Sequence, residues 1–320
     1  MAKNRYVLLT VDTEALPKRA ITDHVQRLMW GKHDQGRAGV AEMAAIGHDL
    51  GLKHVFFVDM CGAYDRLEEI LEVIRWLDED GQDVQLHTHP EYLPESFWLE
   101  HGLRSKPRYM NQYTDETKAQ LVIDYFAHLL TTTTGKPVLA HRAGSFRWNA
   151  STIRALKQAQ IPLSFNNSMS AFYHGQCVFS EATNEPFLWS NGIIEVPATE
   201  KKILPKVGKE EWWARLTYPQ SAYFHIRPWW GKFLLDIISD SPDFAVVLLH
   251  SWSLLYWDDD GQATYVDDQR VQGYHKFLAR LRKDYDVITT PEFLDLHKMG
   301  KIKTSHMVDL TLAEVKSKKK

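Results

Sequence analysis

Near its start the chain reads Tyr6-Val7-Leu8-Leu9-Thr10-Val11-Asp12-Thr13-Glu14, an apolar run that ends in two acids. Three further short apolar runs also end in polar residues, which are His87 and His89, Arg142, and His250. If these runs are parallel strands, their carboxyl ends share one face of the sheet, so the polar groups converge from distant parts of the sequence. This placement predicts an active site at the mouth of an α/β barrel.

The composition is that of an ordinary globular protein. The chain has 320 residues, of which 44% are hydrophobic and 25% are charged, so it can bury a large core without cross-links. A net charge of -3 gives no strong field toward nucleic acid or an anionic membrane, and we expect neither partner. Two cysteines, Cys61 and Cys177, are too few for a disulfide framework or a Cys-rich zinc site, and we expect free thiols.

The ends of the chain carry expectations about location and domain boundaries. The first apolar run stops at Asp12, too early for a secretory signal, and no stretch approaches 18 apolar residues. We therefore expect a cytoplasmic protein without an integral membrane segment. Residues 1–312 are expected to form one domain, and the lysine-rich residues 313–320 a disordered tail.

Short, almost wholly apolar runs alternate with helical patterns along the chain. Strands are expected at 6–11, 54–59, 84–87, 138–141, 162–165, 193–196, 244–250 and 286–289. Helices are expected at 38–50, 64–80, 114–135, 151–160 and 266–283. Such alternation with about eight strands favours a parallel α/β barrel. The long connections 90–113 and 168–231 are expected to be functional loop insertions in a single domain.

Acidic side chains follow two of the expected strands. Asp12 and Glu14 are two residues apart and would point the same way from a strand end, as a metal ligand and a general base. Asp-x-Glu also opens a family of two-metal exonucleases, although this chain lacks a basic strand-binding surface, and acids often cap a following loop. Asp59 ends another apolar run and could reach the same face or cap a helix.

The pair His87 and His89 is the stronger metal signal. In extended backbone both rings face one side, and Glu91 is next on that side if the chain stays extended. A divalent metal such as zinc prefers neighbouring imidazoles with oxygen ligands and an open position for water. The alternative is a pair of strand-end histidines that bond to backbone.

Arg142 and His250 each allow a catalytic and a structural interpretation. The guanidinium of Arg142 could orient a catalytic carboxylate or bind a substrate oxygen, or it could form a structural salt bridge. His250 could act as a general acid with a pKa near neutrality, or it could be a hydrogen-bonded core histidine.

Aromatic residues are the candidate sugar contacts. The chain holds 11 tryptophans, and indole faces stack well on the C–H surfaces of sugars. Several lie in or beside the long connections, at Trp212, Trp213, Trp229, Trp230, Trp252 and Trp257. We take Trp252, Trp148 and the strand-end Asn166 as candidate substrate-binding residues, against the alternative that they are core aromatics and a turn residue.

In their order along the chain these motifs resemble the polysaccharide deacetylase superfamily, the NodB-homology or carbohydrate esterase 4 type. The family's Thr-Phe-Asp-Asp-Gly, His-x-x-x-His, Arg-containing and Leu-x-His motifs correspond to residues 10–14, 87–91, 142–144 and 248–250. Weaker matches at 52–58 and 287–294 extend the resemblance over residues 5–296. It implies a distorted (β/α)7–8 barrel and a divalent metal, zinc being expected. Within the superfamily the chain also resembles the WbmS-like proteins of O-antigen gene clusters, and this resemblance implies a role in O-antigen biosynthesis.

The resemblance also implies roles for individual residues. Asp12 matches the general base, His87 the first metal imidazole, Arg142 the residue that orients the base, and His250 the general acid. Together they imply a hydrolase acting on a carbon–nitrogen bond, which removes an acetyl or formyl group from an N-acylated sugar or polysaccharide precursor. The metal would stabilise the oxyanion, and no serine or cysteine nucleophile is needed.

The chain departs from the family at the metal ligands. Thr13 stands where the family has its metal-binding second Asp, and Glu14 where it has Gly. Glu91 stands at the second metal histidine, while His89 lies two residues earlier. Two ligand sets follow, either His87, His89 and Glu14 or His87, Glu91 and Asp12. Alternative functions are a metal-dependent phosphoesterase or amidohydrolase, and a non-catalytic carbohydrate-binding descendant without metal.

Overall fold

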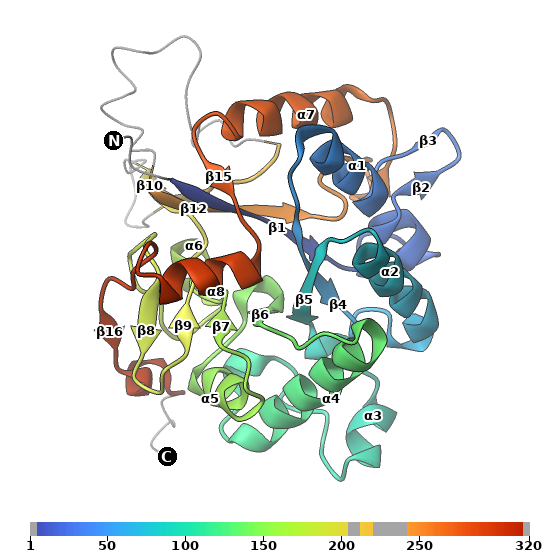
Figure 1. The fold of residues 1–320 in the computed structure, drawn as a ribbon. Coiled ribbons are helices and arrows are strands. Elements are labelled where there is room, and N and C mark those ends of the chain that lie inside the picture. The colour runs from blue at the N-terminus through green and yellow to red at the C-terminus, as the bar shows by residue number, and fades with distance from the viewer. Residues whose placement is uncertain (1–4, 204–211, 220–241, 316–320) are drawn as a thin grey trace.

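A curled, mostly parallel sheet forms the centre of the protein in a computed structural model that describes residues 5–203, 212–219 and 242–315 (Figure 1). Its strands are β1 (Tyr6–Thr13), β4 (Val55–Asp59), β5 (Asp83–Thr88), β6 (Ala140–Ala143), β7 (Leu163–Ser164), β8 (Phe187–Trp189), β9 (Ile194–Glu195), β12 (Phe244–His250), β15 (Asp286–Val287) and β16 (Met307–Val308). The order is β12-β1-β4-β5-β6-β7-β9-β8-β16, and β15 pairs with the start of β1.

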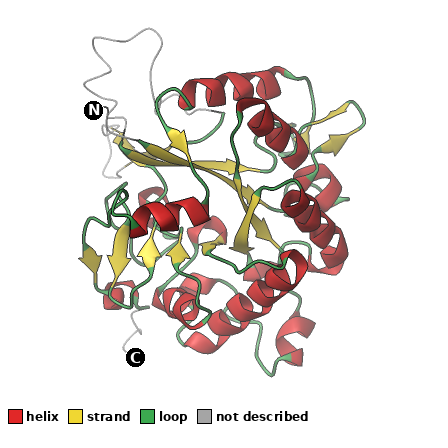
Figure 2. Ribbon diagram, viewed as in Figure 1, coloured by secondary structure: helices red, strands yellow, loops and turns green. Residues whose placement is uncertain are grey.

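Helices pack around this sheet, and the last of them contacts the inner side of the curl through Phe293 (Figure 2). They are α1 (Val40–Leu50), α2 (Leu67–Glu79), α3 (Glu95–Glu100), α4 (Glu116–Thr134), α5 (Ala150–Gln158), α6 (Met169–Tyr173), α7 (Gln269–Leu281) and α8 (Thr290–Lys298). Three two-stranded hairpins lie off the main sheet: β2 (Lys32–His33) with β3 (Gly36–Arg37), β10 (Glu200–Ile203) with β11 (Trp212–Arg215), and β13 (Tyr256–Trp257) with β14 (Ala263–Thr264).

The sequence located the eight principal strands and the five long helices within a few residues. It missed the hairpin strands and, in the main sheet, β8 and β16, which are only three and two residues long and extend the sheet at one edge. β8 runs antiparallel to β9, while the other neighbouring strands of the main sheet are parallel. Among the described strands no pairing joins β12 to β16, so the expected barrel is an open half-barrel.

Helix ends follow the local sequence signals. α4 begins after Asp115, whose carboxylate accepts a hydrogen bond from the Thr117 amide at 3.0 Å. The helix ends at Gly135 with a φ of 69°, a conformation that glycine adopts without steric cost. These ends fix where the chain re-enters the sheet as β6.

Residue parity along the strands separates two apolar layers. On β1, Val7, Leu9 and Val11 pack outward against the helices, while Leu8 belongs to a second cluster inside the curl with Phe57 of β4. Successive side chains on a strand point to opposite faces, so Thr10 and Asp12 share the inner face with Leu8. The catalytic candidates are therefore placed by the same alternation that builds the core.

The carboxyl-terminal end of the described chain packs against the rest of the protein. Ala313 is fully buried at the end of a short 3₁₀ turn, Leu310–Ala313, and Glu314 forms an ion pair with Arg154. Packing therefore continues past residue 312, and residues 316–320 of the expected tail lie outside the described part.

Cys61 and Cys177 are both free and buried. None of the described helices has the length and apolar character needed to cross a membrane.

Stability should fall as the pH drops below about 6.5, partly because His54 resists protonation. Burial, followed by the nearby His48, lowers the pKa of His54 to about 3, while the unfolded chain binds a proton near its ordinary value. At pH values between these two pKa values, the unfolded state binds more protons than the folded state. Lowering the pH through this range therefore stabilises the unfolded state relative to the folded state. The His54→Gln variant keeps a neutral group near the Tyr274 hydroxyl, which lies 2.8 Å from His54 Nε2.

From pH 6 to pH 4 the free energy of unfolding should fall about 2 to 3 kcal/mol less in His54→Gln than in the wild type. Urea unfolding of the metal-free proteins across this pH range measures the difference. Equal pH slopes for the two proteins would show that His54 titrates normally in the folded state.

Candidate metal centre and active site

The carboxyl ends of β1, β5, β6 and β12 bring the polar candidates together inside the curl. In the parallel register Asp12 lies beside His250, and His87 lies beside Arg142. Each pair projects to the same inner face because the partners have matching positions on adjacent strands. The convergence expected from strand ends is thus present in the structure.

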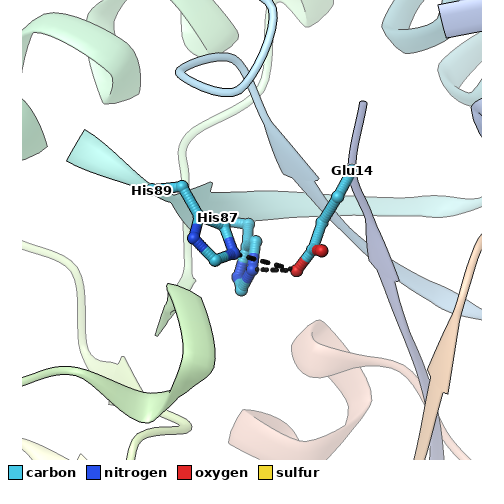
Figure 3. Close-up of side chains that lie close together, drawn as sticks. All are labelled: Glu14, His87 and His89. Atoms are coloured by element: carbon cyan, nitrogen blue, oxygen red, sulfur yellow. Dashed lines mark hydrogen bonds and ion pairs between the residues drawn. The ribbon is translucent and has the colours of Figure 1, made fainter. Parts of the chain in front are cut away.

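Glu14, His87 and His89 form the tightest cluster (Figure 3). Glu14 Oε1 lies 2.8 Å from His87 Nε2 and 3.1 Å from His89 Nε2. All three side chains are buried, with relative exposures of 3%, 0% and 2%. Both rings and the carboxylate point at one another from the ends of β1 and β5, so one small ion could contact all three.

Electrostatics in this cluster favour charge on the carboxylate and on His89. Burial alone would raise the pKa of Glu14, but the charge of His89 and hydrogen bonds from both imidazoles hold it well below its usual value. Burial likewise opposes protonation of His89, yet Glu14 and Glu91 raise its pKa well above the usual value. The cluster therefore places a buried anion where a cation is stabilised.

The donor set fits a divalent metal. Two imidazole nitrogens and one carboxylate oxygen are a ligand combination of catalytic zinc sites, which leave a further position open. Ligand atoms about 2.1 Å from a tetrahedral ion lie about 3.4 Å apart, so only small shifts from the observed 2.8 and 3.1 Å separations are needed. His87, His89 and Glu14 are the residues that would hold the ion.

The outer partners of the two histidines differ. His89 Nδ1 lies 2.9 Å from Glu91 Oε1, the carboxylate contact that commonly orients a metal-bound imidazole. His87 Nδ1 is buried and has no hydrogen-bond partner among the described residues. Glu91 contacts Nδ1 of His89, whereas Glu14 contacts Nε2 of the same ring. Glu91 therefore does not belong to the Glu14–His87–His89 ligand group.

Asp59 holds the backbone that carries His89. Its carboxylate accepts hydrogen bonds from the amides of Cys61, Gly62 and His89 at 3.0, 2.8 and 3.0 Å. Burial raises its pKa, with the charges of His89 and His87 opposing that shift. Asp59 therefore fixes the loop after β4 and the end of β5, and it does not cap the next helical turn, which begins after Ala63 without a side-chain cap.

Arg142 reaches across the inside of the curl from β6 to β1. Its Nη1 donates to Asp12 Oδ1 at 2.5 Å, and its Nη2 donates to Thr10 Oγ1 at 2.9 Å. Thr10 in turn donates to the Val247 carbonyl of β12 at 2.7 Å. The guanidinium lies 4.4 Å from the ring centre of Phe57, which forms a floor beneath it. Sequence reasoning did not assign Thr10 or Phe57 to the site, although Thr10 belongs to the opening motif.

His250 completes a second group of ligand-type atoms. Those of Asp12, Glu14 and His250 lie within 4.8 Å of one another. The His250 ring stacks on Trp252 at 5.0 Å with an interplanar angle of 19°. Burial lowers the pKa of His250, while Glu14 and Asp12 oppose that shift. The candidate acid, the candidate base and the metal-type cluster thus lie next to one another.

The three proposed sugar contacts lie in different surroundings. Trp252 is 7% exposed and packs against His250 at the site. Asn166 uses both ends of its amide internally: Oδ1 accepts from the Ala143 amide at 2.6 Å and Nδ2 donates to Ser164 at 2.9 Å.

Trp148 is fully buried and packs edge-on against Trp189 in the core, at 5.5 Å between ring centroids. The structure gives it no contact with the metal-type cluster. Trp212 and Trp257 are 41% and 42% exposed, and Trp229 and Trp230 lie outside the described residues.

No protein-family model matches the chain, and no curated protein sequence matches it either. Solved structures do share its fold. A Mycobacterium smegmatis protein described as a polysaccharide deacetylase superposes with a TM-score of 0.56 at 15% identity, covering 95% of this chain and 93% of that one. The motif resemblance is thereby confirmed at the level of the fold.

Solved structures with other names also superpose on this chain. A 4-α-glucanotransferase from Thermococcus litoralis has a TM-score of 0.54 at 11% identity, covering 97% of this chain and 42% of that one. The α-amylase AmyC from Thermotoga maritima has a TM-score of 0.52 at 10% identity, with 95% and 76% covered. The chain has the polysaccharide deacetylase fold, and the fold alone does not select the reaction.

Metal titration of the chelator-treated protein tests the ligand set. We expect one tight Zn²⁺ site that is lost in His87→Ala and in Glu14→Gln, because each change removes a ligand. Glu91→Gln should weaken binding about 10- to 100-fold, since it removes the negative charge beside His89 but no ligand. Isothermal titration calorimetry measures all three, with the exposed Glu100→Gln as the matched control. Unchanged zinc affinity in His87→Ala would contradict this assignment.

Proposed function

We propose that the protein is a metal-dependent hydrolase that removes an N-acyl group, acetyl or formyl, from an amino sugar or glycan precursor. The observation that carries this proposal is the convergence of Glu14, His87 and His89 beside Asp12 and His250 at the carboxyl ends of the strands. The fold that surrounds this site is shared with a protein described as a polysaccharide deacetylase, which supports a sugar amide as substrate. We further propose zinc as the metal.

The proposed ligand set explains the departure from the family motif. Thr13 has the parity of Val11, which packs outward, and its hydroxyl donates to the Val11 carbonyl at 3.2 Å. Glu14 is the next residue on the inner side and supplies the carboxylate to the histidines. Glu14 thus takes over the oxygen ligand that the family draws from the position of Thr13.

A divalent ion held there supplies a Lewis acid that polarises an acyl carbonyl and acidifies water. Asp12 is the proposed base, and Arg142 holds its Oδ1 so that the other oxygen can take a proton from water. His250 is the proposed acid that gives a proton to the departing amine. The water oxygen joins the acyl carbon, the carbon–nitrogen bond breaks, and a carboxylate and an amine result.

Trp252 and Asn166 have different proposed roles, one as a contact for the sugar and the other in positioning the backbone. The stacking of Trp252 on His250 holds the imidazole plane, and its indole is the proposed wall against the sugar. Asn166 is proposed to shape the pocket by fixing the Ala143 amide next to Arg142. Trp148 is proposed to support the pocket from the core rather than to contact sugar.

Release of acetate or formate from N-acetylated and N-formylated amino sugars tests the activity. With one equivalent of Zn²⁺ we expect turnover, and Asp12→Asn and His250→Ala should each lower kcat about 10²- to 10⁴-fold, since each removes a proton-transfer group. Calorimetry should show that both variants still bind a metal ion at Glu14, His87 and His89. The matched control is the surface variant Lys157→Ala.

Two results would overturn this function. One is a protein that binds no metal, and the other is His250→Ala with wild-type activity. Binding of glycans without metal or turnover would point instead to a non-catalytic carbohydrate-binding protein. Turnover of phosphate esters but not of amides would point to the phosphoesterase alternative.

A further inference from the structure

A second group of metal-type ligand atoms lies directly beside the first. Asp12, Glu14 and His250 bring two carboxylates and an imidazole within 4.8 Å of one another, and Glu14 belongs to both groups. We propose that this second group is a weaker divalent-cation position whose occupation inhibits the enzyme. The inference rests on the proposed function, because it concerns the proposed base and acid of that reaction.

Backbone register builds the second position. Asp12 and His250 are Cα partners on the parallel strands β1 and β12, and the Ser251 amide donates to the Asp12 carbonyl at 2.9 Å. Neighbouring strands lie about 4.8 Å apart, so the two side chains project next to each other. Glu14 lies two residues beyond Asp12, on the same side. A cation with bonds of about 2.1 Å would need only small side-chain rotations to meet all three.

The three groups retain the atoms that a cation needs. Arg142 engages Oδ1 of Asp12, and an ionised carboxylate has a second oxygen with its own lone pairs. The His250 ring stacks on Trp252, and among the described residues no group forms a hydrogen bond to its nitrogens. Glu14 meets both imidazoles of the first group through Oε1, and its other oxygen can bridge toward His250.

Local charge makes the second position the weaker one. Arg142 already pairs with Asp12, and Glu14 is shared between the two groups, so an ion in the first position would draw on one of the two carboxylates of the second. A second divalent ion would also lie close to the first ion and to the Arg142 guanidinium, and both would repel it. We therefore expect its affinity to be at least about 100-fold lower than that of the first ion.

Occupation of the second position removes both proton-transfer groups. A cation bound to Asp12 takes the oxygen that would accept the proton from water. A cation bound to His250 takes the ring nitrogen that would carry the proton to the amine. Activity should therefore rise with the first equivalent of metal and fall as the second position fills.

Metal binding and turnover measured on the same samples test this inference. The chelator-treated full-length protein is titrated with Zn²⁺, bound metal is counted by native mass spectrometry and equilibrium dialysis, and amide hydrolysis is assayed at each point. We expect two binding events, with activity greatest at one bound ion and at least 10-fold lower at two. His250→Gln and Asp12→Asn should retain the first event and lose the second.

The His54→Gln variant is the matched control, because it changes a buried histidine at the opposite end of β4 and should keep both events. A single binding event in the wild type overturns the inference, and so does greatest activity with two ions bound. Retention of the second event in His250→Gln overturns it as well. Failure of the first event is a different result, since it removes the proposed function itself.

Discussion

The buried ion pair between Arg142 and Asp12 is the interaction on which the site depends. It joins residues 130 positions apart and spans the inside of the curl, because β4 and β5 lie between β6 and β1. The same guanidinium bonds to Thr10, which bonds to β12, so one side chain relates three strands to one another. Loss of either partner would leave an uncompensated buried charge, at a cost of about 3 to 5 kcal/mol.

The metal-type cluster follows from this arrangement of strands. Side chains two residues apart along extended backbone face the same side. Once β1 and β5 are fixed, Glu14 therefore lies on the same inner side as Asp12, and His89 on the same side as His87. Asp59 then fixes the backbone amide of His89 from the neighbouring strand at 3.0 Å. The cluster is thus held by backbone contacts as well as by its own charges, so its three ligand-type side chains converge through protein contacts alone.

Prediction from the sequence was most successful where a side chain sits on a regular strand. Asp12, Arg142 and His250 lie on the strands where the sequence put them, because alternation and parallel pairing are regular there. The prediction weakened one step past the strand end. Glu91 would share the face of His89 only in extended backbone, but the chain turns at His89, with ψ of 66°, into a 3₁₀ turn from Pro90. Glu91 therefore meets the outer nitrogen of His89, and no periodicity in the sequence revealed this. The short edge strands β8 and β16 were missed because segments of three and two residues are too short to show an alternation of apolar and polar residues.

By itself, the sequence determined the class of fold, the eight principal strands and the residues at their carboxyl ends, since apolar runs and residue parity are local properties. Only the tertiary structure decided which groups meet: Glu14 with both histidines, Glu91 behind His89, and Trp148 in the core. It also showed that the barrel stays open, because strand pairing beyond near neighbours depends on how the whole sheet curls. Contacts across the curl join distant segments, and their geometry is set by packing rather than by any local pattern.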